Sequence, residues 1–497
     1  MKAIILAAGL GSRLGDLTKD KPKSLIKVNG KPIIKYQIDA YLNAGISEVL
    51  IVTGYKSVEL ENYIKINYSK NIKFINNVNF DTTNNMYSLW LCKEYVINSE
   101  KIFISNADVV FDESIVLKMV NEKQNIIACD SSQYNYESMK ISINSQSEIT
   151  DISKKITVED SHACSIDLYC FVQSGIISLM DEISKIIKVD KNQWTELAIQ
   201  KIIKEKKMKT FPFYLDNTER WFEIDNLEDL IAADSLFSSL KLKNKKHFIF
   251  DLDGTLYVGN TKIDGASDFI DLLNSLNLNS HFVSNNSSKN KSAYVEKLNS
   301  MGISIYENQI ILSTDATIFS LIKKGYSSGY IIGNESFKQI LFENNLIHNE
   351  INPEFVLLAY DTELTYKKLE EASKFLNKGL PYYATHGDKF CPTENGPIPD
   401  VGSLISLFKT SNNVSPTVFG KPNKLMLRNF FENKISIDDC VFIGDRLNTD
   451  FELAIGSGMD FICVLSGESD RLDIEKYNST PNLIVNSVKD LIKLIKS

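Results

Sequence analysis

Short apolar runs recur along this chain, and many of them end abruptly in Asp, Asn, Ser or Gly. Clear examples are residues 2–8, 48–52, 101–105, 248–250, 281–283 and 441–443. Segments with helical spacing separate these runs. Strands that alternate with helices predict an α/β fold, in which a mainly parallel sheet is covered by helices on both faces. In such sheets ligands bind beyond the carboxyl ends of the strands, so the polar residues that end the runs are the candidates for chemistry.

The chain divides near residue 240. At 497 residues it is too long for one hydrophobic core. Residues 238–246 have the composition of a connector, and the apolar run that follows begins a new series of elements. The sequence therefore predicts two domains, residues 1–240 and 241–497. Within the second we expect a core at about residues 246–312 and 412–497, and an inserted cap at about residues 313–411.

Charge and cysteine usage exclude several classes of protein. A net charge of −8 argues against a nucleic-acid-binding protein. The seven cysteines are scattered without a CxxC pair, which suits a reducing cytoplasm and argues against a disulfide framework or a zinc site. The first apolar run is too short for a signal peptide, and no run is long enough to span a membrane. We therefore expect a cytoplasmic protein that binds neither membrane nor nucleic acid.

A glycine-rich loop follows the first strand. It contains Gly9, Gly11 and Gly15, and the basic residues Arg13 and Lys23 lie in it or just beyond it. Such a loop lets backbone N–H groups approach phosphate oxygens, and the two cations supply full charges to a triphosphate. A flexible strand–helix turn is the simpler interpretation of the glycines alone.

Two acidic residues end later strands of the first half. Asp108 follows the apolar run at residues 101–107, and Asp225 follows Trp221-Phe222-Glu223-Ile224. Either residue alone is typical of a solvated strand end or a helix cap. Together with the glycine loop they suggest a site where a divalent cation bridges phosphate and carboxylate oxygens.

The first half resembles the sugar-phosphate and choline-phosphate nucleotidyltransferases. Their LAAGxGxRL signature is matched here by residues 6–14, their PK pair by Pro22-Lys23, and their next block by residues 28–34. The resemblance extends to about Phe237 and implies a Rossmann-like nucleotidyltransferase domain whose catalytic Mg²⁺ is held by Asp108 and Asp225. It implies catalytic roles for Arg13 and Lys23. It places the nucleotide on Leu6, Ala7, Ala8, Gly9, Leu10 and Gly11.

Residues 81–89 indicate a branch of that family. They resemble the TNNxYSL block of the phosphocholine and 2-aminoethylphosphonate cytidylyltransferases, and residues 152–156 resemble the same branch. The resemblance implies CTP as the nucleotide, bound in part by Asn84 and Asn85. Either asparagine alone is equally well explained by turn chemistry. A sugar 1-phosphate transferase that uses UTP or dTTP is the alternative.

The acceptor stays open, because the chain departs from the branch in two places. Residues 164–169 replace a strand in which the family usually has a glycine, and the acidic segment at residues 194–196 is altered. A quaternary ammonium acceptor requires aromatic faces. Tyr169, Trp194 and Trp221 are candidates, although aromatic residues at such places are more often part of a core. Phosphocholine, an aminoalkyl phosphonate and glycerol phosphate all remain possible acceptors.

The second half contains four apolar runs that end in polar residues. They end in the sequences DLDGT, SNNSS, GKP and GDRLNTD. Adjacent strand ends of one parallel sheet are expected to bring these signals together. A lone DxD pair is more often a solvated turn, but four signals in this order are not explained that way.

These four signals resemble the motifs of the haloacid dehalogenase superfamily of phosphatases, from Lys246 onward. By this resemblance Asp251 is the nucleophile that forms an aspartyl phosphate, and Asp253 is the general acid and base. Ser284 and Lys421 hold the phosphoryl oxygens. Mg²⁺ is held by Asp251, Asp445 and the backbone carbonyl of Asp253, and Asp450 supports the site.

Spacing places a cap between Ser284 and Lys421. Its alternating strand signals resemble the α/β cap of the type IIA branch, which usually has an asparagine where His386 stands. A cap over the site excludes water and selects the substrate. His386 and Asp388 are therefore candidate substrate contacts, although either residue alone is more often structural.

The combined hypothesis is a bifunctional enzyme. A CTP-dependent cytidylyltransferase that acts on a small alcohol phosphate or phosphonate is fused to a Mg²⁺-dependent phosphatase for a small phosphomonoester. Synthesis of surface polysaccharide precursors is the setting that such a fusion suggests. A chain in which one half serves only for binding or dimerisation is the alternative, and a homo-oligomer is possible.

Overall fold

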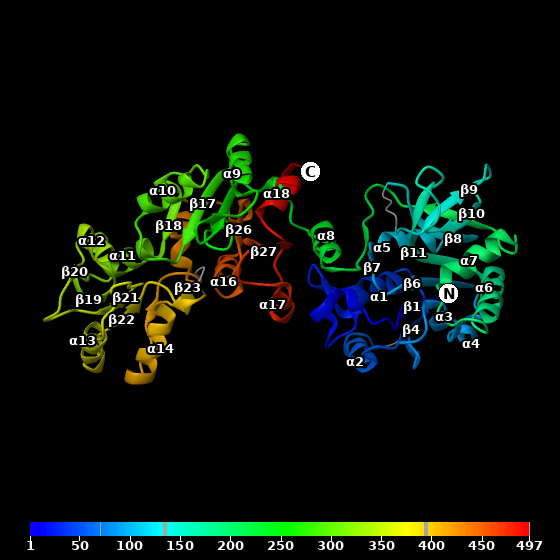
Figure 1. Cartoon of the computed structure of the whole chain (residues 1–497), viewed down its shortest axis with the longest axis horizontal. Coiled ribbons are helices and arrows are strands. Elements are labelled where there is room, and N and C mark those ends of the chain that lie inside the picture. Colours follow the sequence, from blue (N-terminus) through cyan, green and yellow to red (C-terminus); the bar gives the residue numbers. More distant parts are fainter. Residues whose placement is uncertain (70, 133–136, 392–395, 497) are drawn as a thin grey trace. The chain divides into compact units, whose positions relative to one another are not determined.

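The computed structural model describes residues 1–69, 71–132, 137–391 and 396–496. The chain folds into two compact units, Met1–Phe237 and Ser238–Ser497 (Figure 1). Both units are α/β, as the alternating pattern predicts. No helix within the described ranges is both long and apolar enough to cross a lipid bilayer.

The first unit is built on a nine-stranded sheet. Seven strands follow the order β10-β9-β11-β6-β1-β4-β5, and β8 pairs with β11 and β12. Their bounds are β1 (Lys2–Ala7), β4 (Glu48–Thr53), β5 (Ile72–Asn76), β6 (Lys101–Asn106), β8 (Asn125–Asp130), β9 (Lys140–Ile143), β10 (Ile149–Ser153), β11 (Ala163–Val172) and β12 (Thr210–Tyr214). The strands β6, β1, β4 and β5 are parallel, whereas β11 runs antiparallel to β6, β8 and β9. The sheet is therefore more mixed than the sequence predicts.

Both faces of this sheet are buried. Alternate residues of β1 enter two separate hydrophobic clusters, Ile4 and Leu6 on one face and Ala3, Ile5 and Ala7 on the other. This is the period-two geometry of a strand covered on both sides. One face packs against α3 (Asn85–Trp90), α4 (Lys93–Val96), α6 (Gln173–Ile186) and α7 (Thr195–Lys204), and the other against α1 (Ile33–Asn43), α2 (Ser57–Asn67) and α5 (Glu113–Met119).

A small two-stranded ribbon lies beside the main sheet. Strands β7 (Val109–Phe111) and β13 (Trp221–Glu223) pair antiparallel, with Glu223 opposite Val109. The pairing continues one residue further, because the amide of Ile224 donates to the carbonyl of Asp108 at 3.0 Å. The ribbon therefore brings together two acidic strand ends that are more than a hundred residues apart. Helix α8 (Leu227–Phe237) follows and closes the unit.

The core of the second unit is a parallel sheet in the order β18-β17-β14-β26-β27-β28. The bounds are β14 (His247–Asp251), β17 (Asn279–Ser284), β18 (Ile310–Leu312), β26 (Cys440–Gly444), β27 (Asp460–Val464) and β28 (Leu483–Val485). Strand β14 lies between β17 and β26, so three of the polar signals end on neighbouring strands, as predicted. The helices around the core are α9 (Ala266–Ser275), α10 (Lys291–Ser300), α15 (Arg428–Glu432), α16 (Glu452–Ser457), α17 (Arg471–Lys476) and α18 (Val488–Lys496).

The cap has a parallel sheet of its own, in the order β20-β19-β21-β22-β25. Its elements are α11 (Ser313–Lys323), β19 (Ser328–Ile332), α12 (Glu335–Glu343), β20 (Ile347–His348), β21 (Val356–Leu358), α13 (Tyr366–Asn377), β22 (Tyr382–Ala384), α14 (Val401–Asn412) and β25 (Thr417–Val418). Strand β25 carries the third signal, and it pairs with β22 of the cap sheet. The prediction that all four signals end strands of one sheet is therefore wrong for this one, because the segment before Lys421 extends the cap.

Three short antiparallel strand pairs complete the described strands. They are β2 (Lys27–Val28) with β3 (Lys31–Pro32), β15 (Tyr257–Val258) with β16 (Thr261–Lys262), and β23 (Phe390–Cys391) with β24 (Ile398–Pro399).

Candidate active sites

The glycine-rich loop of the first unit lies above two neighbouring hollows. One is about 330 Å³ and the other about 300 Å³ in volume. Six of the eight residues that the sequence assigns to the nucleotide belong to β1 and this loop, and each lines one hollow or the other: Leu6, Ala7, Ala8, Gly9, Leu10 and Gly11. Gly11 has φ +63°, and a Cβ there would lie 2.8 Å from Cβ of Lys23. The loop can therefore pack against Lys23 only because this position is a glycine.

Two carboxylates and two cations meet below this loop. Nζ of Lys23 lies 3.0 Å from Asp108 and 3.1 Å from Asp225. Arg13 binds Asp225 with two nitrogens, at 2.8 and 2.9 Å. Burial lowers the pKa of Lys23, but the two neighbouring carboxylates outweigh burial and the net shift is upward. All four of these predicted residues therefore lie together.

The cluster fits a divalent cation. Asp108, Glu223 and Asp225 each offer a carboxylate oxygen, and these oxygens lie within 4.8 Å of one another. Oδ1 of Asp108 is buried and has no hydrogen-bond partner among the described residues. Hard oxygen ligands of this kind suit Mg²⁺. The sequence missed Glu223, whose pKa rises to about 7 because of burial, Asp108 and Asp225. Its place in the acidic strand end at residues 221–225 was the available signal.

The predicted asparagines hold the far wall of the pocket together. Asn84 caps α3, because its side chain accepts from the amide of Asn85 at 2.8 Å. The side chain of Asn85 accepts from the amide of Thr195 at 2.8 Å and donates to Asn106 at 3.3 Å. Both asparagines line the pocket, so each combines a structural contact with access to a ligand.

The three candidate aromatic residues differ. Trp194 and Trp221 line the pocket, and Trp194 is 51% exposed, whereas Tyr169 is 1% exposed and does not line it. The prediction of an aromatic contact from Tyr169 is therefore wrong, since a buried ring cannot cover a ligand. Its hydroxyl is engaged instead with Asp167 and Glu196, at 3.0 and 2.9 Å. Asp167, which was not predicted as a site residue, also lines the pocket.

In the second unit a buried lysine joins two aspartates. Nζ of Lys421 contacts Asp251 directly and lies 2.7 Å from Asp450. Burial raises the pKa of Asp445 well above its usual value, and Asp251 and Asp450 raise it further. Burial likewise raises the pKa of Asp450 to about 6, against the opposing effect of Lys421. Carboxylate oxygens of Asp251, Asp445 and Asp450 lie within 4.8 Å of one another. This crowding of acids fits a divalent cation.

Glycines surround the Asp445 carboxylate. A Cβ at Gly254 or Gly467 would collide with it, and the amide of Glu468 donates to it at 2.7 Å. Asp253 is partly buried at the mouth of this site, and burial followed by Asp251 raises its pKa. A raised pKa suits a group that must donate a proton near neutral pH. Ser284 ends the adjacent strand and lies 3.3 Å from the hydroxyl of Tyr294.

The two predicted cap contacts also differ. His386 is 0% exposed, and its ring nitrogens lie 3.0 Å from Asp400 and 2.9 Å from Thr385. The prediction that His386 contacts substrate is wrong, because both nitrogens are engaged inside the cap. Asp388 accepts from Asn285 at 3.2 Å and lies 3.5 Å from Arg446. Arg446 was not predicted as a site residue, although it directly follows Asp445 in the fourth signal.

Comparisons with known proteins match the two halves of the chain to different protein families. A family model for nucleotidyl transferases matches residues 2–238. Models for haloacid dehalogenase-like hydrolases match residues 248–347 and 418–491. Acid sugar phosphatase of Staphylococcus saprophyticus is 31% identical over 255 residues, which are 51% of this chain and 98% of that protein. The 5'-nucleotidase YutF of Bacillus subtilis is 31% identical over 51% of this chain and 100% of its own length.

The structure of 4-nitrophenylphosphatase from Thermotoga maritima superimposes on the same half. Its TM-score is 0.50 at 32% identity, and the match covers 52% of this chain and 99% of that one. The fold and sites thus define an enzyme that joins a transferase to a hydrolase. The chain belongs to the haloacid dehalogenase-like hydrolases and carries a nucleotidyl transferase domain before the hydrolase domain.

Proposed function

We propose that the first unit is a CTP-dependent cytidylyltransferase for a small alcohol phosphate or phosphonate, and that the second is a Mg²⁺-dependent phosphomonoesterase. The observation that carries the proposal is that each unit has a lysine-bridged pair of aspartates. In the first unit the pair lies directly below a glycine-rich loop. In the second, Asp251 ends β14 and Asp450 lies in the helical turn Leu447–Phe451 that follows β26.

In the first unit an oxygen of the acceptor phosphate attacks the α-phosphorus of CTP, and pyrophosphate leaves from the opposite side. The chain's part is to hold the two reactants in line and to neutralise the phosphate charge. Arg13 and Lys23 turn from the carboxylates to the triphosphate, while Asp108, Glu223 and Asp225 hold Mg²⁺. The metal supplies charge neutralisation of the transferring phosphate when bound.

The choice of CTP and the choice of a small acceptor both rest on the resemblance of residues 81–89 to the phosphocholine and 2-aminoethylphosphonate cytidylyltransferases. The hollow beside the acidic cluster is about 330 Å³, and the amides of Asn84, Asn85 and Asn106 are part of its lining.

In the second unit a carboxylate oxygen of Asp251 attacks the phosphorus of a phosphomonoester. Asp253 gives its proton to the departing alcohol and afterwards takes one from the water that hydrolyses the aspartyl phosphate. Lys421 and Ser284 hold the phosphoryl oxygens. Asp251, Asp445 and the carbonyl of Asp253 hold Mg²⁺, which offsets the charge on the phosphoryl group.

The fusion suggests one pathway for both activities. A phosphatase that removes phosphate from a triose or polyol phosphate would act on the same kind of small molecule that the transferase activates. CDP-activated small alcohols are donors for surface polysaccharides, and we propose that setting for the pair.

The nucleotide and acceptor are tested by pyrophosphate release from the Asp251→Asn protein, in which the phosphatase is silent. CTP, UTP, dTTP, ATP and GTP are each paired with phosphocholine, 2-aminoethylphosphonate, glycerol phosphates and hexose 1-phosphates. Turnover only with CTP and a small acceptor supports the proposal. Turnover with UTP or dTTP and a hexose 1-phosphate would establish the alternative transferase.

The phosphatase is tested separately with the Asp108→Ala protein. Phosphate release is measured from triose phosphates, glycerol phosphates, sugar phosphates and nucleoside monophosphates. The last two are included because the relatives named above are a sugar phosphatase and a 5'-nucleotidase. Mg²⁺-dependent turnover of a triose or polyol phosphate supports the pathway. No release from any of them would refute the pathway proposal.

A further inference from the structure

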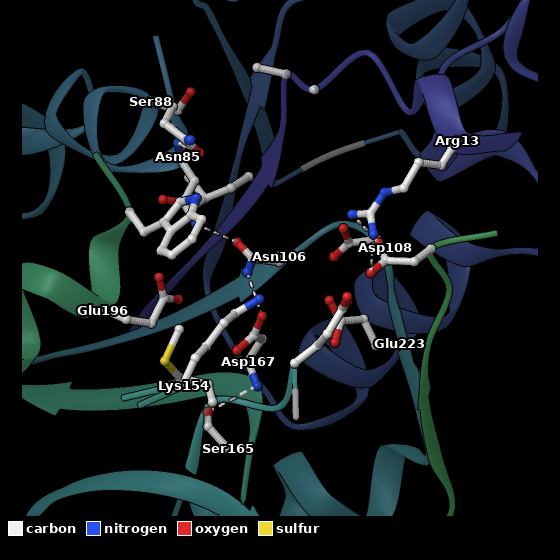
Figure 2. A pocket seen from close by; sticks show the side chains of 18 of the residues that line it. Arg13, Asn85, Ser88, Asn106, Asp108, Lys154, Ser165, Asp167, Glu196 and Glu223 are labelled. Atoms are coloured by element: carbon white, nitrogen blue, oxygen red, sulfur yellow. Dashed lines mark hydrogen bonds and ion pairs between the residues drawn. The ribbon is translucent and has the colours of Figure 1, made fainter. Parts of the chain in front are cut away.

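Asp167 has an unusual backbone for its place in a strand. It lies in the middle of β11 but has φ +57°, and the pairing of β11 with β8 shifts register between Ser165 and Tyr169. Left-handed backbone is unfavourable for most residues and is tolerated best by glycine, asparagine and aspartate. The irregularity places the side chain of Asp167 in the pocket, where its carboxylate faces Asn106, Glu196 and Glu223 (Figure 2).

The carboxylate of Asp167 belongs to a cluster in which two carboxylates share one hydroxyl group. Asn106 donates to one oxygen at 2.8 Å. The hydroxyl of Tyr169 lies 3.0 Å from the other oxygen and 2.9 Å from Glu196. A hydroxyl has one hydrogen, so it cannot donate to both carboxylates at once. Burial raises the pKa of Asp167 well above its usual value, and Glu196 raises it further.

Such a cluster is completed by a ligand that brings hydrogens. A hydroxyl or a primary ammonium donates to carboxylates, whereas a quaternary ammonium has no hydrogen to donate. Buried acceptors that are left without a donor cost free energy, so the pocket discriminates between the two kinds of ligand.

The aromatic residues of the same pocket do not form a cage for a quaternary ammonium. The nitrogen of Lys154 lies 5.2 Å above the ring of Trp194, so that face of the ring is already covered by a cation. Trp221 is tied to Asp130 through its ring nitrogen at 2.7 Å. Tyr169 is buried. A cationic ligand without hydrogens would therefore find few free aromatic faces among the described residues.

We infer that Asp167, together with Glu196, determines acceptor specificity by accepting hydrogen bonds from the acceptor's head group. The acceptor is accordingly a small phosphate ester or phosphonate with a hydroxyl or primary ammonium head, and not phosphocholine. This inference rests on the transferase activity proposed above and narrows its substrate class.

The test compares acceptors in the full-length Asp251→Asn protein by pyrophosphate release with saturating CTP. Glycerol 3-phosphate, phosphoethanolamine and 2-aminoethylphosphonate are each measured against phosphocholine. We expect kcat/KM to favour at least one of the first three over phosphocholine by about tenfold or more. Phosphocholine as the best acceptor would overturn the inference while leaving the transferase proposal intact. No turnover with any acceptor and any nucleotide would refute the transferase proposal itself.

Two substitutions at Asp167 keep the backbone that the site requires. Glycine and asparagine both tolerate the left-handed conformation, so Asp167→Gly and Asp167→Asn are expected to fold. Asp167→Gly removes the carboxylate and should lower kcat/KM for the preferred acceptor about tenfold or more, with the KM for CTP changed less than about twofold. An unchanged ranking of acceptors in this variant would overturn the inference.

Asp167→Asn distinguishes a hydroxyl head group from a primary ammonium head group. It also provides a second test if the Asp167→Gly protein is unstable. The amide oxygen still accepts from a hydroxyl but no longer pairs with an ammonium. A small loss, of about threefold, therefore indicates a hydroxyl head, and a loss of about a hundredfold indicates a primary ammonium. A gain with phosphocholine and no loss with the other acceptors would contradict the role of the carboxylate.

Discussion

The two candidate active sites share one arrangement of charged side chains but differ in how deeply these side chains are buried. In each, a lysine lies between two aspartates that come from distant parts of the unit. Around Lys23 the cluster is partly open, since the Arg13 side chain is 64% exposed and Asp108 is 29% exposed. Around Lys421 it is closed, with the lysine 3% and Asp450 0% exposed. The same pairing of one lysine with two aspartates therefore occurs in a partly exposed site and in a buried one.

The difference follows the chemistry proposed for each site. A nucleotide and an acceptor must both enter the first site, and the cations there must leave the carboxylates to meet the triphosphate. The second site forms a covalent bond to Asp251, and a surrounding of low polarity strengthens each charge that acts on the phosphoryl group. The first site is therefore open because its side chains must rearrange around two substrates. The second is closed because its charged side chains are already in position before the substrate binds.

The largest expected effect is the separation of the two activities. Asp251→Asn removes the nucleophile and should lower phosphatase kcat by about 10⁴-fold. Asp108→Ala removes a metal ligand and should lower pyrophosphate release by about 10³-fold. Each variant should keep the other activity within about twofold, measured by phosphate and pyrophosphate assays on the same preparations. Equal loss of both activities in either variant would show that the sites are not independent.

The second prediction concerns stability. Lys421→Met leaves two buried carboxylates without their cation and should destabilise the second unit by about 3–5 kcal/mol. Lys23→Met removes a lysine whose side chain is 13% exposed, but Arg13 still pairs with Asp225, so the loss in the first unit should be smaller, about 1–2 kcal/mol. Both are measured by urea denaturation.

The chain offers a natural probe for this comparison. All three of its tryptophans, Trp90, Trp194 and Trp221, lie in the first unit. Tryptophan fluorescence therefore reports that unit, and circular dichroism reports both. If Lys421→Met shifts the fluorescence transition as much as the dichroism transition, the difference between an open and a closed cluster does not govern stability.

The third prediction is an acid sensitivity specific to the second unit. His281 lies 3.1 Å from His247, and burial followed by this neighbour lowers its pKa to about 4. Because the folded form binds its proton less readily, the unfolded chain is protonated first as the pH falls below about 6.5. The contribution of His281 is present above that pH and is lost progressively down to about pH 4.

The matched variant isolates this contribution from those of the carboxylates. Between pH 7.5 and pH 5, wild type should lose about 2 kcal/mol more than His281→Phe does, measured by urea denaturation followed by dichroism. The fluorescence transition of the first unit should be the same in both proteins. Parallel pH profiles for the two proteins would contradict the prediction.

The smallest expected effect distinguishes two glycines of the loop. Gly11→Ala places a Cβ against Lys23 in a left-handed backbone and should destabilise the first unit by about 1–2 kcal/mol. Gly9→Ala meets nothing within 4 Å and should leave stability unchanged, but its methyl group faces the hollow and should raise the KM for CTP. Fluorescence-detected denaturation and pyrophosphate release measure the two effects. An equal loss of stability in both would show that the contact with Lys23 is unimportant.

The strand pattern and strand ends were predictable because they depend on local sequence. Alternating burial at Ile4, Ile5 and Leu6 follows from a period of two, and Asp251 follows an apolar strand. What the sequence did not predict depends on distant contacts. Tyr169 and His386 are buried by residues that are distant in the sequence, so the pattern of neighbouring residues does not predict their burial. Asp167 depends on one backbone angle, and the edge strand before Lys421 joins a sheet whose other strands are far away in sequence.

The ribbon of β7 and β13 has a consequence for synthesis of the protein. The nine-stranded sheet is complete once Tyr214 has been made, yet Asp225 arrives later and reaches Asp108 only through this ribbon. In the second unit β14 likewise waits for β26, which follows the entire cap. On the ribosome the first half can therefore complete its sheet while still inert, whereas the second half completes its core sheet and gains its chemistry only as its last segments emerge.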